Sequence, residues 1–195
     1  MKDQIIKIFE TSAKVKQEFA RENAELVQEV VELIASTFTR GNKLLLFGNG
    51  GSAADASHIA GEFVNRFLLE RPPLPAIALN TDIAVLTSIS NDYHYNEIFA
   101  KQLKALGQEG DLAIGISTSG TSPNVVKAFE AAKDMGITTV AFTGNKDRGG
   151  KLAAIADYAF VVPSTETPRI QETHITLAHT ICQLVDEQLF GSGKR

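Results

Sequence analysis

Two ionisable side chains near the first third of the chain have the spacing of a reactive pair. His58 and Glu62 are four residues apart, so on a helix they lie on one face. An imidazole beside a carboxylate can bind a metal ion or exchange protons with a substrate. On spacing alone, such a pair is more often a solvated surface couple. Its place shortly after a glycine turn favours chemistry, because that face can look into the same cleft.

A second set of polar residues lies on the helix expected at 169–190. Its polar side chains recur at helical spacing, and they are Glu172, Thr176, His179 and Gln183. Gln171 lies about 80° from His179 around the helix axis, near enough for both to reach one ligand. The pattern by itself equally fits a solvent-facing side. His94 and His174 have no comparable setting and are expected to be surface or packing residues.

The glycine turn joins an apolar run at 43–47 to the helix that carries His58. Its residues are Gly48, Asn49, Gly50, Gly51 and Ser52. Glycine lets the backbone approach a ligand, and the first amides of a helix have no partner within it. The match to the dinucleotide fingerprint G-x-G-x-x-G is partial, because Ala53 replaces the third glycine. The turn therefore indicates a phosphate site without specifying the phosphate compound.

A second turn of this kind follows the apolar run at 111–116. It places the hydroxyls of Ser117, Thr118, Ser119 and Thr121 around Gly120, and Ser122 and Pro123 then start a helix. Hydroxyls and free amides suit a phosphate monoester better than a carboxylate. An ordinary helix cap is the simpler interpretation, as is a capping box of Ser52 and Asp55 in the first turn. Two such turns, each at the end of a strand, favour phosphate binding.

Length and composition indicate a single domain spanning 1–195, because 195 residues are enough for one core and few for two. The net charge of −4 argues against nucleic-acid binding. No apolar run reaches membrane length, and the N-terminus lacks a leader pattern, so no membrane association is expected. One cysteine, Cys182, fits a reducing cytoplasm.

Short apolar runs alternate with helical patterns from residue 42 onward, which predicts an α/β fold. We expect a doubly wound, five-stranded parallel sheet in a flavodoxin-like three-layer sandwich, with ligands at the carboxyl ends of the strands. The expected strands are 43–47, 76–80, 111–116, 137–142 and 158–162. The expected helices are 52–67, 82–89, 96–106, 122–135, 149–155 and 169–190. Residues 3–39 are predicted to form two N-terminal helices that end at Gly41. Segment 1–41 either joins subunits or covers one face of the sheet.

Four segments together resemble a known family. They are GNGGSAADASHIAGEF, SNDYHYNEIF, GDLAIGISTSGTSPNVVKA and RIQETHITLAH, in this order. Across essentially the whole chain they resemble the phosphoheptose isomerases, the sedoheptulose 7-phosphate isomerases of the SIS (sugar isomerase) superfamily. The ISTSG turn alone indicates only a phosphosugar-binding SIS domain. The combination of His58 and Glu62 with Gln171 and His179 is more specific.

The resemblance implies roles for individual residues. Zinc would be bound by His58, Glu62, Gln171 and His179, and Glu62 and His179 would be the base and the acid. The substrate would be contacted by Asn49, Gly50, Gly51, Ser52, Glu62, Asn91, Asp92, Ser117, Thr118, Ser119, Ser122 and Gln171. The family also implies a homotetramer with sites between subunits. Some members carry an acidic residue where this chain has Pro168, so one substrate contact is missing or replaced.

The implied reaction is an aldose–ketose isomerisation that begins the synthesis of heptose precursors for lipopolysaccharide or other surface glycans. A proton moves between C1 and C2 through an enediol or enediolate, which needs a base, an acid and a stabilised oxygen. Since Glu62 cannot easily be a tight ligand and a free base, the metal is either loosely held or rearranges. The alternatives are a non-catalytic SIS protein that binds a partner such as a replication initiator, and a nucleotide-binding Rossmann domain.

Overall fold

A five-stranded parallel sheet forms the centre of the computed structural model, which describes residues 1–191. The strand order is β2-β1-β3-β4-β5, as expected for a flavodoxin-like doubly wound fold. All five predicted strands are present, within two residues of the expected ends. Their bounds are β1 (Leu44–Gly48), β2 (Ala76–Ala78), β3 (Leu112–Ser117), β4 (Thr138–Gly144) and β5 (Tyr158–Val162).

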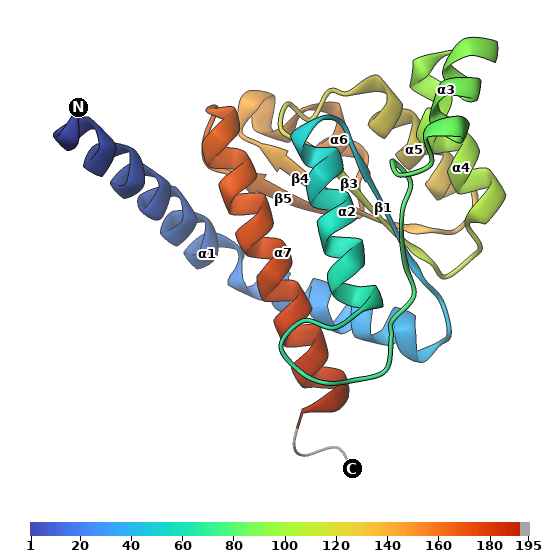
Figure 1. The fold of residues 1–195 in the computed structure, drawn as a ribbon, viewed down its shortest axis with the longest axis horizontal. Coiled ribbons are helices and arrows are strands. Elements are labelled where there is room, and N and C mark those ends of the chain that lie inside the picture. The colour runs from blue at the N-terminus through green and yellow to red at the C-terminus, as the bar shows by residue number, and fades with distance from the viewer. Residues whose placement is uncertain (192–195) are drawn as a thin grey trace.

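Helices cover both faces of this sheet (Figure 1). One face packs against α1 (Lys2–Thr39), α2 (Gly51–Val64) and α7 (Thr167–Phe190). The other face packs mainly against α4 (Ile98–Leu106), α5 (Pro123–Asp134) and α6 (Gly150–Ile155), and α3 (Ile83–Asp92) lies outside α4. Two short 3-10 helices, η1 (Tyr95–Glu97) and η2 (Lys146–Gly149), lie in the connections. The three layers confirm the predicted sandwich.

The register of the strands brings both predicted anion turns to one edge of the sheet. Gly48 at the end of β1 pairs with Ile116 in β3, and Ser117 at the end of β3 pairs with Thr143 in β4. Because the chain leaves β1 into α2 on one face and leaves β3 toward α5 on the other, a crevice opens between these strands. Both turns flank this crevice.

The prediction of two N-terminal helices is wrong, because residues 2–39 form the single helix α1. No glycine or proline occurs between Lys2 and Thr39. Asn23, in the polar middle of this segment, donates from Nδ2 to the carbonyl of Phe19, 2.9 Å away. The polar interruption is therefore accommodated inside the helix. Gly41 ends it as predicted, with φ +80° and its amide bonded to the carbonyl of Phe38.

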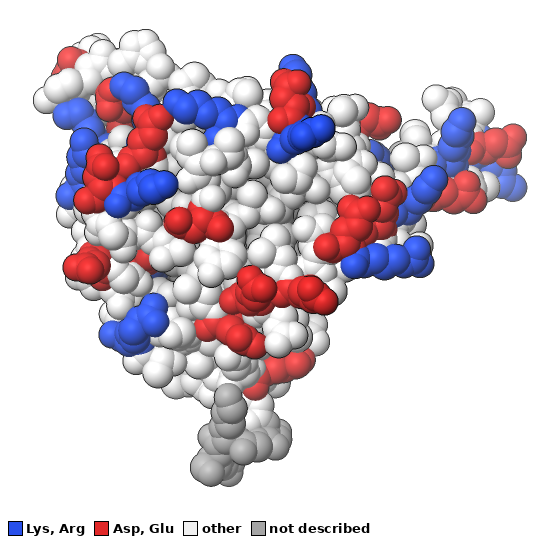
Figure 2. Space-filling view, turned by 180° about the vertical axis from the view of Figure 1, so that it is seen from behind, with Lys and Arg blue, Asp and Glu red and all other residues white. Residues whose placement is uncertain are grey.

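The first part of α1 projects from the body of the molecule (Figure 1). Its buried positions begin only at Phe19. Figure 2 shows acidic and basic side chains intermixed along this projecting end. Among residues 1–191, we find no helix with the combined length and apolar character needed to cross a membrane.

Candidate active site

The glycine turn is shaped by the close approach of α7. Gly50 precedes α2 with φ +56°, and Gly51 begins the helix. A Cβ on Gly51 would lie 2.2 Å from Nε2 of Gln171, so a larger residue would have to displace that amide. The predicted contact residues Asn49 and Ser52 flank this point, and the hydroxyl-bearing Ser52 is buried. The capping box of Ser52 and Asp55 does not form, since Gly50 is the N-cap and no side chain caps α2.

The hydroxyls of the second turn form hydrogen bonds with one another. The Oγ atoms of Ser117 and Ser122 are 2.9 Å apart, and Oγ1 of Thr121 donates to Oγ of Ser119 at 3.0 Å. Ser122 is the N-cap of α5, as predicted, but its hydroxyl bonds Ser117 and not a helix amide. A hydroxyl can rotate to donate to a new acceptor. This group of hydroxyls at the N-terminus of α5 suits an anion.

Two hydrogen bonds to backbone carbonyls fix the serine turn, which comprises residues 117–122. The amide of Gly144 donates to the carbonyl of Thr118 at 3.2 Å, and the amide of Leu152 donates to that of Gly120 at 2.9 Å. A Cβ on Gly120 would lie 1.8 Å from the carbonyl oxygen of Gly149. The chain after β4 therefore closes tightly over the serine turn.

His58, Glu62 and His179 meet between α2 and α7. Nε2 of His58 is 2.9 Å from Oε1 of Glu62 and 3.1 Å from Nε2 of His179. One ligand atom from each residue lies within 4.8 Å of the others. The ring of Phe67 stacks on His179 with centroids 5.3 Å apart. The imidazole of His179 is thus held between the ring of Phe67 and His58.

Gln171 lies nearer the start of α7. Its amide packs on Gly51, whereas His179 contacts His58, seven residues further along α2. Eight residues separate Gln171 from His179, about 12 Å along a helix. The structure therefore gathers three of the four proposed zinc ligands and places the fourth against the glycine turn.

A buried ion pair, which the sequence analysis missed, sets the register of α2 against α7. Nε of Arg71 donates to Oδ1 of Asp186 at 2.8 Å, and both side chains are almost fully buried. The guanidinium also donates to the carbonyls of Glu62 and Phe63, at 2.8 and 2.7 Å, near the end of α2. A cation at the C-terminus of a helix is favourable. Arg71 therefore ties the helix of Glu62 to the helix of His179.

Asn91 and Asp92 lie at the exposed end of α3, bonded to each other at 2.9 Å. Three residues later, the hydroxyl of Tyr95 donates to Oδ1 of Asn49 at 2.9 Å. This bond brings the end of α3 to the same edge of the sheet as the glycine turn. Nothing in the spacing of the sequence pointed to Tyr95.

Two further titratable groups of α7 are buried packing residues. His174 donates or accepts at Nε2 with the carbonyl of Thr143, 3.1 Å away, and burial lowers its pKa to about 4. Its expected packing role is confirmed. Burial, with the carboxylates of Glu62 and Asp186, raises the pKa of the Cys182 thiol to about 12. Both side chains are almost fully buried, and His94 is exposed as expected.

Comparison with known proteins agrees with this architecture. The SIS domain family matches residues 8–144. Phosphoheptose isomerase from Thermodesulfovibrio yellowstonii is 63% identical over 190 residues, covering 97% of this chain and 94% of its own length. The enzyme of that name from Aquifex aeolicus is 54% identical over 189 residues, covering 97% and 98%. The chain belongs to the phosphoheptose isomerases of the SIS domain family.

A solved structure of this family superimposes closely. Phosphoheptose isomerase from Neisseria gonorrhoeae matches with a TM-score of 0.89 at 40% identity, covering 95% of this chain and 98% of that one. The chain is therefore an isomerase with the SIS α/β fold. The non-catalytic alternative is not favoured, because the similar proteins are isomerases.

Proposed function

We propose that this chain converts D-sedoheptulose 7-phosphate to D-glycero-D-manno-heptose 7-phosphate, a step toward lipopolysaccharide or other surface glycans. The observation that carries the proposal is that Glu62 and His179 come together on α2 and α7, the two helices that border the glycine turn. The names of the similar proteins support the substrate class. The single free cysteine, Cys182, fits a cytoplasmic enzyme.

The serine turn would hold the phosphate of the sugar. Ser117, Ser119 and Ser122 offer rotatable hydroxyls. The start of α5 adds few amide donors, because Pro123 has no N–H and the N–H of Val125 bonds to Oδ1 of Asn124. Hydrogen bonds to the phosphate lie far from the reacting carbons. Their binding energy would orient the sugar chain for the reaction. Asn49, Asn91 and Asp92 would contact oxygens of the sugar chain at the same edge of the sheet.

Glu62 and His179 would carry the protons. The Glu62 carboxylate removes a proton from C1 while His179 donates one to the C2 carbonyl oxygen, giving the 1,2-enediol. Glu62 then returns its proton to C2, and the O1 hydroxyl gives its proton to His179 as the C1 carbonyl forms. Each group ends as it began, so no other reactant is required.

The ligand atoms of the cluster fit a zinc ion. Tetrahedral Zn–N bonds of about 2.05 Å place neighbouring ligand atoms about 3.3 Å apart, close to the separations of 2.9 and 3.1 Å around His58. His58, Glu62 and His179 would hold the ion. Gln171, whose amide packs on Gly51, is proposed as the fourth ligand once its side chain turns toward them. Bound zinc would supply Lewis-acid polarisation of the sugar carbonyl. A carboxylate has two oxygens, so Glu62 retains an acceptor for the proton.

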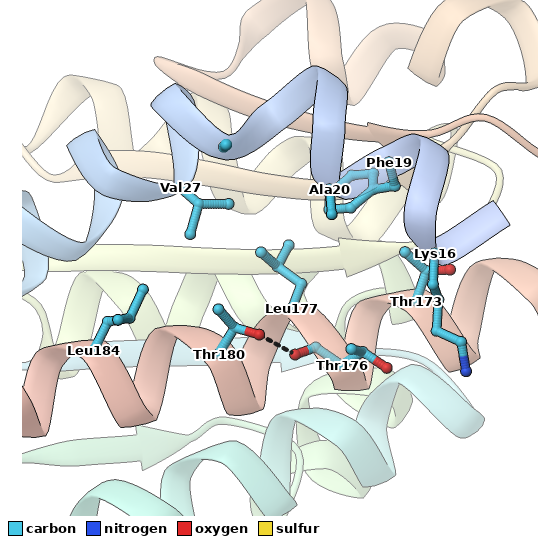
Figure 3. A pocket seen from close by; sticks show the side chains of 10 residues that line it. Lys16, Phe19, Ala20, Val27, Thr173, Thr176, Leu177, Thr180 and Leu184 are labelled. Atoms are coloured by element: carbon cyan, nitrogen blue, oxygen red, sulfur yellow. Dashed lines mark hydrogen bonds between the residues drawn. The ribbon is translucent and has the colours of Figure 1, made fainter. Parts of the chain in front are cut away.

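Assembly into a homotetramer is proposed from two unpartnered apolar surfaces. Four large side chains of the projecting end of α1 are exposed, and these are Ile5, Ile6, Ile8 and Phe9. An open cavity of about 250 Å³ lies between α1 and α7, lined largely by apolar atoms (Figure 3). It includes Phe19, Val27 and Leu177 and lies away from the α2 side of α7. A second copy of the chain would cover both surfaces, and light scattering would measure the assembly.

A product assay tests the proposed reaction. We expect Glu62→Gln and His179→Ala each to lower turnover of sedoheptulose 7-phosphate by about 10²–10⁴-fold, as loss of acid–base catalysis does. Glu187→Gln, an exposed change on α7, is the matched control and should retain wild-type turnover. Undiminished turnover in either of the first two variants contradicts the assigned roles.

A further inference from the structure

A network of three side chains lies beside the cleft and includes one proposed substrate contact. Nδ2 of Asn49 donates to Oδ1 of Asn124 at 2.9 Å, and Nδ2 of Asn124 donates back to Oδ1 of Asn49 at 2.8 Å. The hydroxyl of Tyr95 donates to the same Oδ1 of Asn49 at 2.9 Å. The three residues come from the β1–α2 turn, from α5 and from η1.

The direction of these bonds is fixed by one backbone amide. Oδ1 of Asn124 also accepts from the N–H of Val125 at 3.0 Å, and a backbone N–H can only donate. Asn124 therefore presents its oxygen at that position and its nitrogen toward Asn49. Asn124 is almost fully buried, so turning its amide would place two donors against each other inside the protein, which is unfavourable.

The orientation of Asn49 follows from that of Asn124. Its Oδ1 must face the amide nitrogen of Asn124, and it accepts a second bond from Tyr95, so both acceptor positions of the oxygen are used. One N–H of Nδ2 is bonded to Asn124. The second N–H has no bond to the described residues and is the one polar position of the Asn49 side chain left for a ligand.

We propose that Tyr95 and Asn124 are positioning residues that make Asn49 a pure N–H donor to a substrate oxygen. This inference rests on the proposed function for the identity of the substrate. It implies that the atom opposite Asn49 is an acceptor, a carbonyl or developing enediolate oxygen, and not a hydroxyl that must donate. A preoriented N–H stabilises negative charge on such an oxygen without reorganisation during the reaction.

A double-variant cycle tests the inference. Tyr95→Phe removes only the hydroxyl, and we expect kcat/KM to fall about fivefold, as for loss of one neutral hydrogen bond. Tyr93→Phe is the matched control, because Tyr93 is exposed and its ring contact with Lys101 does not need the hydroxyl. In an Asn49→Ala background, Tyr95→Phe should have no further effect, since Tyr95 acts through Asn49.

Two kinetic results overturn the inference. One is equal kcat/KM for the Tyr95→Phe, Tyr93→Phe and wild-type proteins. The other is a fall in kcat/KM on Tyr95→Phe that is as large in the Asn49→Ala background as in the wild type. Melting temperatures of the same variants give a second cycle that needs no substrate. The network predicts non-additive shifts for Asn49→Ala with Tyr95→Phe and with Asn124→Ala, and additive shifts contradict it. An inactive wild-type protein would refute the proposed function, and the melting cycle would still decide the network.

Discussion

His58 and His179 present their Nε2 atoms to each other at 3.1 Å, although 121 residues separate them in the chain. Two protonated nitrogens would repel at this distance, and so would two lone pairs, so one nitrogen carries a hydrogen and the other accepts. The Glu62 oxygen, 2.9 Å from His58, adds a second acceptor. A cation that replaces the shared hydrogen would satisfy all three atoms.

Zinc binding should therefore release a proton and strengthen as pH rises. Titration calorimetry in two buffers of different ionisation enthalpy measures that proton. His58→Ala and His179→Ala should weaken zinc binding by more than the roughly 10–100-fold loss typical of changing a residue that only hydrogen-bonds a ligand. His94→Ala removes an imidazole outside the cluster and should leave zinc affinity unchanged. Zinc affinity that is independent of pH and of His58 would argue against this site.

Removing one partner of the Arg71–Asp186 pair should strongly destabilise the protein. Asp186→Ala leaves the buried guanidinium unpaired, and we expect the free energy of unfolding to fall by about 3–5 kcal/mol in urea denaturation. Lys151→Ala breaks an ion pair between side chains that are 60% and 51% exposed, which should change stability by about 0.5 kcal/mol or less. Similar losses in the two variants would show that burial does not decide the effect.

Gly120 and Gly61 should respond oppositely to replacement by alanine. At Gly120, φ is +65° and the added Cβ would lie 1.8 Å from the Gly149 oxygen, so we expect a loss of about 2 kcal/mol or more and weaker binding of inorganic phosphate. Gly61 lies within α2, and its Cβ would meet nothing within 4 Å, so Gly61→Ala should gain about 0.5–1 kcal/mol. Urea denaturation and phosphate titration measure both effects. Unchanged phosphate binding in Gly120→Ala would contradict the role of the serine turn.

His174 should make the protein less stable in mild acid. Its pKa is about 4 in the fold, against 6.5 for an ordinary histidine, so below pH 6.5 the unfolded chain binds a proton that the folded protein does not. The stability that this pKa difference contributes is therefore fully present above pH 6.5 and is lost as pH falls toward 4. His174→Gln lacks this titration. Its stability deficit relative to wild type should shrink by about 2–3 kcal/mol between pH 7.5 and 4.5, whereas a constant deficit would refute the assignment.

Local patterns in the sequence were sufficient for the elements and for the two turns. Apolar runs of strand length predicted the parallel sheet. The glycine turns that follow two of these runs, at Gly48 and Gly120, predicted the edge of the sheet at which the anion turns lie. The spacing of His58 and Glu62 placed them on one face. The single helix α1 was missed because its polar middle resembles a break, while Asn23 bonds within the helix.

The sequence by itself determined which residues share a helix face and where each strand ends, because backbone periodicity and turn geometry are set by near neighbours. Only the tertiary structure decided which faces meet. His179 reaches His58 because α7 packs on α2 in a register held by Arg71, and Tyr95 reaches Asn49 across 46 residues. Such contacts depend on the packing of whole elements, and no local pattern encodes them.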